Sequence, residues 1–512
     1  MKAAKGIAAA IALTILSGIA ASAQDFDVVI LNGRVMDPET GFDQIANVGI
    51  NNGFITRITA DAIEGKRAID ATGHVVAPGF IDGHSHAQDP FGHRLYLRDG
   101  VTTAMDLELG AYPISDYYEF WEGKAQINYG ASVGHPWARM SVLDGIDPKG
   151  RGFYNTSLAD SLADGAKWQT KTFDPLDMPN VSAAVETGLK EGGLGVGFPI
   201  GYYTAVGSPE VMEIAGIAKE YGAFITSHAR YLAQVPPSGF LGMQEMINVA
   251  HLQDVPLLLH HIPSNCLGLT TACLDLIDEA RANGVRVVGE FYPYTFASTY
   301  ANADYLRPGY QQQLGITGKD LVVIETGEQL DDEKFDKLRE EAPGTYLLMY
   351  SMKEKDMRAA LERPGVVFGS DGMPFFNEDG TSPGIDAPYG TGRGHPRGAG
   401  AHARFLRIVR EDAPVTMMQA LSKLSYELAD FLDDSVPQFK LRGRLQEGMI
   451  ADITIFDPEA VTDNSSWETG QNTMPSTGIP YVLVNGVVIV DKSEVQANLF
   501  PGVPIRRQIT NE

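Results

Sequence analysis

Short hydrophobic runs separated by turn residues mark the first part of the chain. The β-branched run 26–31, for example, is followed by the turn Asn32-Gly33. Turn signals at intervals of about ten residues are typical of a small β-sandwich. The same pattern returns near the C-terminal end, as in residues 481–490. We therefore expect residues 24–77 and 441–512 to form one β-sandwich from both ends of the chain.

A different pattern fills residues 78–440, where apolar runs that end in polar side chains alternate with segments of helical periodicity. Eight parallel strands with functional groups at their C-terminal ends form a TIM barrel, so we predict an α/β fold with a (β/α)8 barrel as the catalytic domain. The expected strand ends are His84 with His86, Glu108, His135, Gly197-Phe198, His228, His261, Glu290 and Asp371. Helices are expected over residues 209–221, 273–283, 355–361 and 401–411, and loops over the barrel mouth in residues 139–175 and 379–400.

The N-terminal residues have the pattern of a secretory signal peptide. Lys2 and Lys5 precede an apolar stretch, residues 6–20, which is followed by Ala21-Ser22-Ala23. We predict that residues 1–23 are removed after Ala23 and that the mature protein is periplasmic or secreted; an uncut membrane anchor is the alternative. No later stretch reaches about 18 uninterrupted apolar residues, so stable membrane insertion is not expected.

Charge and cysteine content exclude several classes of protein. The formal net charge of -25 argues against nucleic acid or an anionic membrane as a partner, because both need basic patches. Cys266 and Cys273 are the only cysteines, too few for a disulfide scaffold. They can pair in an exported protein, and two buried free thiols are an equal alternative.

Four histidines at strand ends predict a catalytic divalent metal. Successive side chains alternate across a strand, so His84 and His86 project to the same side. His228 and His261 each close an apolar run in the same way. Neutral imidazoles are the commonest zinc ligands, and rim histidines without a metal would not share this placement so regularly.

Asp371 ends the last expected strand, in Gly369-Ser370-Asp371-Gly372. A carboxylate beside a metal site can take a proton from the attacking water and return it to the leaving group. Asp is also a favoured helix N-cap residue, and placement alone leaves both roles open.

These residues resemble the amidohydrolase superfamily, and within it the N-acyl-D-amino-acid deacylase (D-aminoacylase) branch. The matches run along nearly the whole mature chain. They are Gly79 to His86, Arg98 to Thr103, Gly134-His135-Pro136, Glu191 to Gly197, Ser227 to Arg230, Tyr292-Pro293-Tyr294, Gly369 to Gly372, His395-Pro396-Arg397, and the tail motifs Arg442 to Leu445, Ala451-Asp452 and Val484-Asn485-Gly486.

The resemblance implies one metal position at His84 and His86, a second at His228 and His261, and Asp371 as general base and acid. His260 competes with His261, whose His-x-x-Ser pattern fits the family better. Deacylases of this branch usually have a bridging cysteine near the end of strand two, where this chain has Glu108. Glu108 is the expected bridging ligand, Lys190 is the alternative, and one or two zinc ions or another divalent metal are expected.

Four further residues are predicted to bind substrate. Arg230 follows His228 by two residues and so points to the same side of the strand, where its guanidinium could hold a carboxylate; a structural ion pair is the alternative. Tyr203 and Tyr292, like the neighbouring Tyr202 and Tyr294, could line the pocket or only pack. His395 lies with Arg397 on the second expected loop.

The predicted reaction is hydrolysis of the amide bond in N-acyl (D-)amino acids or related carboxylate-bearing amides. The substrate is a small molecule, and a homo-oligomer is compatible with the sequence. Alternatives within the superfamily are a cyclic amidase of the hydantoinase or dihydroorotase kind, a dipeptidase, and a hydrolase of xenobiotic or toxin amides. A secreted binding protein without catalysis would be expected to have lost a ligand or Asp371, and none is missing.

Overall fold

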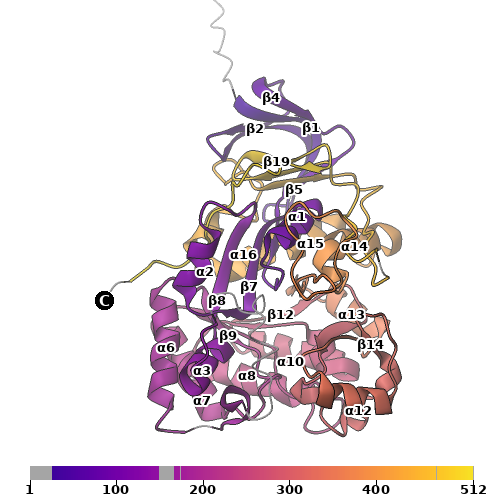
Figure 1. Cartoon of the computed structure of the whole chain (residues 1–512). Helices are drawn as coiled ribbons and strands as arrows, with labels where there is room; N and C mark the ends of the chain where they lie inside the picture. Colours follow the sequence, from indigo (N-terminus) through magenta and orange to yellow (C-terminus); the bar gives the residue numbers. More distant parts are fainter. Residues whose placement is uncertain (1–25, 149–165, 173, 469, 511–512) are drawn as a thin grey trace, which may run out of the picture.

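The computed structural model describes residues 26–148, 166–172, 174–468 and 470–510. The predicted signal peptide, residues 1–23, lies outside the described residues. A domain rich in β-strands sits above a larger barrel with its surrounding helices (Figure 1). Within the described parts of the chain, no helix is long and apolar enough to cross a membrane.

Both ends of the chain contribute strands to one nine-stranded sheet. Its hydrogen-bonded order is β20-β19-β18-β17-β5-β1-β2-β3, and β4 pairs with β1. Alternating buried side chains such as Val35, Val48 and Ile455 pack into its core, as expected from the sequence pattern. The strands are β1 (Phe26–Asp37), β2 (Phe42–Asn51), β3 (Phe54–Thr59), β4 (Gly65–Asp70), β5 (Val75–Pro78), β17 (Ile453–Phe456), β18 (Tyr481–Val484), β19 (Val487–Asp491) and β20 (Glu494–Val495).

Eight parallel strands form the predicted barrel, in the order β16-β12-β11-β10-β9-β8-β7-β6. The amide of Ser370 donates to Asp82 Oδ1 (3.1 Å) and that of His86 to the carbonyl of Gly372 (2.8 Å), so the first and last strands meet and the (β/α)8 prediction is confirmed. The strands are β6 (Phe80–Asp82), β7 (Val101–Ala111), β8 (Asn128–Gly134), β9 (Gly195–Phe198), β10 (Phe224–Ser227), β11 (Leu257–Leu259), β12 (Val287–Phe291) and β16 (Val366–Phe368).

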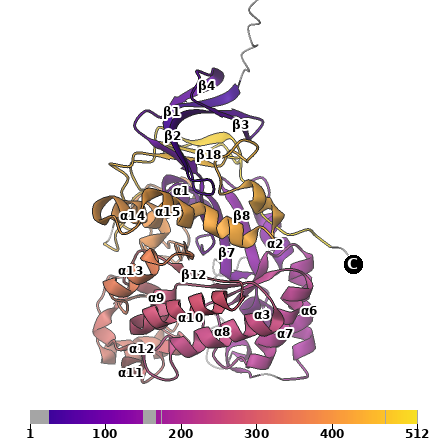
Figure 2. The same ribbon diagram turned by 180° about the vertical axis from the view of Figure 1, so that it is seen from behind.

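The four predicted helices are present, with ends shifted by a few residues at most. They are α7 (Ser208–Glu220), α10 (Thr270–Ala282), α13 (Glu354–Glu362) and α14 (Arg397–Asp412). In Figure 2, α7 and α10 lie on the same side of the barrel as α8 (Gly239–Gln253) and α3 (His135–Asp144). Helix α3 corrects one expectation, because residues 139–144 are helical and not loop. Burial of the polar Arg139 against Glu210 hides the helical periodicity in the sequence.

Two features of the fold bear directly on the site. A small antiparallel sheet, in the order β13-β15-β14, is inserted between β12 and β16; its strands are β13 (Ala297–Tyr300), β15 (Tyr346–Met349) and β14 (Leu321–Val323). A disulfide joins Cys266 to Cys273 and so links α9 (Ile262–Cys266), which follows β11, to α10.

Candidate metal centre

The two histidines after β6 converge through their Nε2 atoms, which lie 3.2 Å apart. Each imidazole is held from behind by a carboxylate. His84 Nδ1 lies 2.7 Å from Glu290 Oε1, and His86 Nδ1 lies 2.9 Å from Asp106 Oδ2. Because a carboxylate accepts hydrogen bonds and cannot donate them, both Nδ1 atoms carry the proton. Each Nε2 atom then turns toward the centre of the cluster, where it can act as a ligand.

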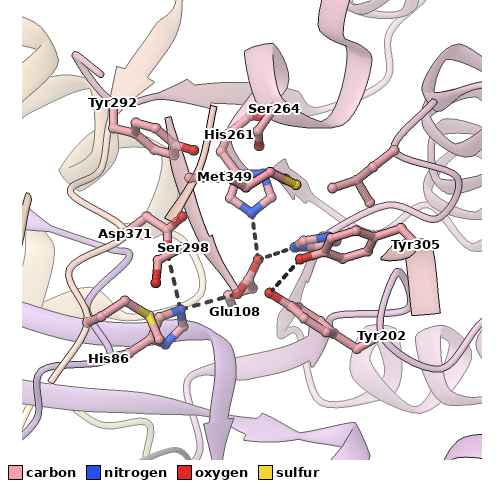
Figure 3. A pocket seen from close by; sticks show the side chains of 14 residues that line it. His86, Glu108, Tyr202, His261, Ser264, Tyr292, Ser298, Tyr305, Met349 and Asp371 are labelled. Atoms are coloured by element: carbon pink, nitrogen blue, oxygen red, sulfur yellow. Dashed lines mark hydrogen bonds and ion pairs between the residues drawn. The ribbon is translucent and has the colours of Figure 1, made fainter. Parts of the chain in front are cut away.

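Glu108, inside β7, connects the two predicted metal positions. Its Oε2 lies 3.3 Å from His84 Nε2 and 3.2 Å from His86 Nε2. Its Oε1 lies 3.1 Å from His228 Nδ1 and 2.9 Å from His261 Nε2. One carboxylate oxygen therefore faces each pair of histidines, which is the arrangement of a bridging ligand. Figure 3 shows Glu108 at the centre of this cluster.

The donor set fits two divalent cations of the zinc type. With Nδ1 protonated, His84 and His86 turn their Nε2 atoms toward each other and toward a buried carboxylate oxygen, an arrangement that is favourable when a proton or a metal cation lies between them. Nitrogen and carboxylate oxygen are ordinary zinc ligands, and four of these side chains are histidines. His228 Nε2 and His261 Nδ1, which face away from Glu108, have no hydrogen-bond partner among the described residues.

The charged groups of the cluster shift one another's pKa values. Burial lowers the pKa of His84, but the carboxylates of Glu290, Asp371 and Glu108 outweigh burial and raise it well above its usual value. Burial, followed by the neighbouring His228, lowers the pKa of His261 to about 4. The carboxylates around His84 thus attract positive charge to the first histidine pair. His261, in the second pair, stays neutral, as a metal ligand must be.

The structure also distinguishes between the alternative residues at two ligand positions, His261 or His260 and Glu108 or Lys190. His261 points its Nε2 at Glu108, whereas His260 places its Nδ1 2.7 Å from Glu290 Oε2 and does not line the pocket. Lys190 lies at the end of α6 (Met178–Lys190) and pairs with Glu186 at 3.1 Å. Its side chain is a third exposed, so it is not a bridging ligand.

Asp371 lies three residues after the end of β16 and faces the first histidine pair. Its Oδ1 is 3.4 Å from His84 Nε2 and 3.5 Å from His86 Nε2, and its Oδ2 accepts a hydrogen bond from Arg397 Nη2 at 2.9 Å. Burial raises the pKa of Asp371, but the charges of Arg397 and His84 outweigh burial and lower it below its usual value. Asp371 caps no helix here, and its carboxylate is ionised beside the Nε2 atoms of His84 and His86.

A pocket opens onto this cluster from the barrel mouth. Its described lining residues come from the ends of barrel strands, from the segments that follow them and from the insertion that carries the small sheet, so these parts of the fold enclose one cavity. They are His86, Glu108, Tyr202, His228, Leu232, His261, Ser264, Tyr292, Ala297, Ser298, Tyr305, Met349, Asp371 and Met373. Figure 3 shows Tyr202 and Tyr305 on one side of Glu108, and Asp371, Ser298 and His86 on the other.

Three of the four predicted substrate residues do not line the pocket, and Tyr292 does. The guanidinium of Arg230 forms an ion pair outside the pocket. Its Nε lies 2.6 Å from Glu245 Oε2, and its Nη1 donates to two carbonyl oxygens. The strand β10 ends at Ser227, so the alternation that placed Arg230 beside His228 no longer applies. The structural ion pair is the arrangement observed.

Tyr203 and His395 are buried behind the pocket wall. The hydroxyl of Tyr203 lies 2.9 Å from His135 Nδ1, and its neighbour Tyr202 lines the pocket instead. His395 Nε2 lies 3.0 Å from the carbonyl of Phe296, and its Nδ1 accepts from the amide of Arg397 at 3.0 Å. His395 therefore holds the start of α14, which positions the Arg397 guanidinium.

Several pocket residues were missed because no local signal marks them. Ser298 and Met349 belong to the inserted sheet, and only the tertiary fold brings this sheet over the barrel. Leu232 and Met373 are single apolar residues in irregular segments. Asp106, which holds His86 and does not line the pocket, was also missed. The sequence did contain a signal for it, because its spacing of two from Glu108 places both carboxylates on the same side of a strand.

Comparisons with known proteins agree with this geometry. No family model matches the chain. An N-acyl-D-glutamate deacylase of Alcaligenes xylosoxydans xylosoxydans is 28% identical over 538 residues, covering 94% of this chain and 97% of the relative. The chain is thus similar over nearly its whole length to a named deacylase of N-acyl-D-glutamate. A D-aminoacylase of the same organism is 24% identical, with 91% of this chain and 95% of that relative covered. The resemblance noted from the motifs is thereby confirmed.

Solved structures support the same fold. The crystal structure of the N-acyl-D-glutamate deacylase from Bordetella bronchiseptica, with zinc and a phosphonate inhibitor, superposes with a TM-score of 0.76 and 23% identity. The match covers 94% of this chain and 100% of that one. An L-hydantoinase from Arthrobacter aurescens covers the chain equally well but reaches a TM-score of only 0.58 at 17% identity. The fold is therefore closer to the deacylase than to this cyclic amidase.

Proposed function

We propose that this protein is a zinc-dependent hydrolase that cleaves the amide bond of N-acyl-D-amino acids. The main observation behind this proposal is the position of Glu108. It presents one carboxylate oxygen to each of two histidine pairs, beside the ionised Asp371. The named deacylases among its relatives support this reaction class. His84, His86, His228, His261 and Glu108 would hold one or two zinc ions. Bound there, zinc supplies a Lewis acid and makes hydroxide available near neutral pH.

Asp371 moves the proton in this reaction. Its carboxylate is ionised and buried within 3.5 Å of the histidine nitrogens, so it can accept a proton from the attacking water. The protonated side chain can then give the proton to the nitrogen of the leaving amine. Oδ1 of Asp371, which faces the histidine nitrogens, thus serves both halves of the hydrolysis, and Arg397 keeps the carboxylate oriented through Oδ2.

Arg397 replaces Arg230 as the residue that we propose to hold the substrate carboxylate. The Arg397 side chain is only 1% exposed, and its Nε and Nη1 have no hydrogen-bond partner among the described residues. The guanidinium carbon lies 4.9 Å from the ring centroid of Tyr292, which lines the pocket. Ser298 Oγ, also without a partner, faces the same cavity. A carboxylate would satisfy these buried donors together.

The test is hydrolysis of N-acetyl D- and L-amino acids by the zinc-loaded mature protein, with Asp371→Asn as the variant. We expect release of free D-amino acids, loss of nearly all turnover in Asp371→Asn, and unchanged zinc content in that variant. Full activity of Asp371→Asn, or activity on hydantoins without activity on linear amides, would contradict the proposal. Zinc content by mass spectrometry separates loss of the proton carrier from loss of the metal.

We also propose that the mature protein acts outside the cytoplasm, after cleavage behind Ala23. The signal-peptide pattern of residues 1–23 supports export. The Cys266–Cys273 disulfide is consistent with it, because disulfides persist mainly in oxidising compartments. N-terminal sequencing of protein from the periplasm or medium of the host should begin at Gln24; an intact Met1 would overturn the proposal.

A further inference from the structure

Of the four histidines that face Glu108, His261 is the one with a strained backbone. Its φ of 30° and ψ of 60° lie in the left-handed region, which a histidine rarely adopts. It also lies two residues beyond the end of β11, so the pairing of the barrel strands does not fix its backbone. Strain of this kind persists only where the surroundings hold the residue in place. The second metal position therefore depends on the segment that follows His261.

The short helix α9 holds His261 from the C-terminal side. The amides of Ser264 and Asn265 donate to the carbonyl of His261 at 3.0 and 3.2 Å, and Ser264 Oγ donates to the same oxygen at 3.0 Å. The start of α8 packs directly against this turn, since a Cβ on Gly239 would lie 1.9 Å from the carbonyl oxygen of Asn265. Helix α9 has only five residues, however, and so short a helix is not stable by itself. It can hold His261 only if its far end is held as well.

The far end of α9 is also strained, and the disulfide closes it. Cys266 is the last residue of α9, and Leu267 after it has a φ of 47°, which is unusual for a leucine. The bond from Cys266 to Cys273, seven residues further on, encloses Leu267 and fixes the end of α9 to α10. In Figure 2, α9 lies beside α10. The covalent link thus opposes relaxation at Leu267, which would release α9.

We infer that the Cys266–Cys273 disulfide holds His261 at the second metal position, and that the first metal position is retained without it. The inference rests on the proposed function, through the zinc site that this function requires. The first position lies on the other oxygen of Glu108, opposite His84 and His86. A link that closes so short a loop removes less entropy from the unfolded chain than a link between distant segments, so its main effect is local.

The test measures zinc affinity by chelator competition in Cys273→Ala, which breaks the bond from the side of α10 and leaves the sequence of α9 unchanged. We expect zinc at the second position to bind about 10- to 100-fold more weakly, as when a group that orients a ligand is removed. Cys266→Ala/Cys273→Ala should give the same result, which excludes the freed thiol as a zinc ligand. Cys273→Ser, which is close to isosteric, replaces the alanine variant if that variant does not fold.

A double-mutant cycle shows whether the disulfide acts through His261. In the His261→Ala background, Cys273→Ala should change zinc affinity by less than about twofold, because the residue that the disulfide holds is already gone. In the His84→Ala background, which leaves the second position, Cys273→Ala should still weaken zinc binding by about tenfold or more. A general loss of stability would affect both backgrounds alike.

The outcomes separate this inference from the proposed function. Equal effects in the two backgrounds, or wild-type zinc affinity in Cys273→Ala, overturn the inference and leave the proposed function standing. A wild-type protein that binds zinc but cleaves no N-acyl-D-amino acid overturns the proposed function alone. A wild-type protein that binds no zinc overturns both.

Discussion

At the residue scale, Glu290 is an orienting group for the metal ligands. Its two oxygens each lie 2.7 Å from a histidine Nδ1, that of His84 and that of His260, and its side chain is 1% exposed. A carboxylate can accept from both rings, whereas an amide has one oxygen to accept with. Glu290 therefore fixes the ring of His84 in the orientation that turns Nε2 toward Glu108.

Replacement of Glu290 by Gln should weaken zinc binding by about 10- to 100-fold, because His84 or His260 loses its acceptor. Chelator competition on the folded protein measures the zinc dissociation constant directly. Asp106→Asn is the matched variant, since Asp106 holds His86 in the same way, and should have an effect of similar size. Unchanged zinc affinity in Glu290→Gln would remove its orienting role.

One pair of substrates distinguishes Arg397 from Arg230 as the residue that binds the substrate carboxylate. In Arg397→Gln, kcat/KM for N-acetyl-D-leucine should fall about 100-fold further than kcat/KM for N-acetyl-D-leucinamide, which lacks the carboxylate. Any effect of the variant on Asp371 changes both substrates alike and cancels in the ratio. Arg230→Gln is the control and should leave the ratio unaltered. The opposite result would restore Arg230 as the carboxylate ligand.

At the element scale, the π-helix η5 (Ser422–Tyr426) carries a buried lysine beneath the barrel. The ammonium of Lys423 donates to the carbonyls of Arg363 and Val366, each at 2.7 Å. Burial nevertheless lowers the pKa of Lys423 to about 8 from a usual value of 10.5. The unfolded chain thus holds this proton more tightly than the folded protein does.

Lys423 should make stability depend on pH in the alkaline range. Between pH 8 and 10.5 the unfolded chain binds more protons than the folded protein, so the unfolding free energy rises with pH. The penalty for the buried charge is full below pH 8 and is relieved by about 3 kcal/mol at most near pH 10.5. Urea denaturation of the wild type and Lys423→Met across this range measures the difference. A difference that does not change with pH would show that the charge has no such effect.

The inserted sheet supplies part of the pocket wall and none of the candidate metal ligands. Strands β13 and β15 bring Ser298 and Met349 to the barrel mouth, although 50 residues lie between them in the sequence. Neither strand contains a metal ligand. Their contribution is the wall of the cavity, which variation in this insertion could alter while the metal centre stays intact.

At the scale of the whole molecule, Asp452 joins the nine-stranded sheet to the barrel. It is 3% exposed and accepts hydrogen bonds from Arg442, from Asn128 Nδ2 of β8 at 3.1 Å and from the amide of Asn485 at 2.7 Å. Strands β5 and β6 are separated only by Gly79. The two parts share a buried polar junction, and we expect them to unfold together.

Asp452→Asn should destabilise the entire protein by about 3–5 kcal/mol, because it leaves the Arg442 charge buried without its partner. Thermal unfolding should keep one transition at a lower midpoint, with activity lost over the same temperatures. Asp43→Asn is the matched control, since Asp43 pairs with Arg34 at the surface and contributes at most about 1 kcal/mol. Two separate transitions in Asp452→Asn would show that the parts unfold independently.

The sequence by itself determined the features that depend on local periodicity. The spacing of two residues predicted that His84 and His86 meet, which they do just beyond the end of β6, and apolar runs located all eight barrel strands. Parallel strands of a barrel deliver their C-terminal ends to one face, so Glu108, His228, His261 and Asp371 had to meet there. These parts of the site could be predicted because backbone geometry alone relates strand position to side-chain direction.

Only the tertiary structure decided what lies beyond the strand ends. Arg230 follows the end of β10, where the chain turns and alternation no longer holds, and so it pairs with Glu245. Met349 lines the pocket from the inserted sheet, and Arg397 reaches the pocket carboxylate Asp371 from α14, both through contacts between segments distant in sequence. No local pattern encodes such contacts, because they depend on how loops and insertions pack on the barrel. The metal centre is therefore readable from strand periodicity, whereas the substrate pocket is set by packing.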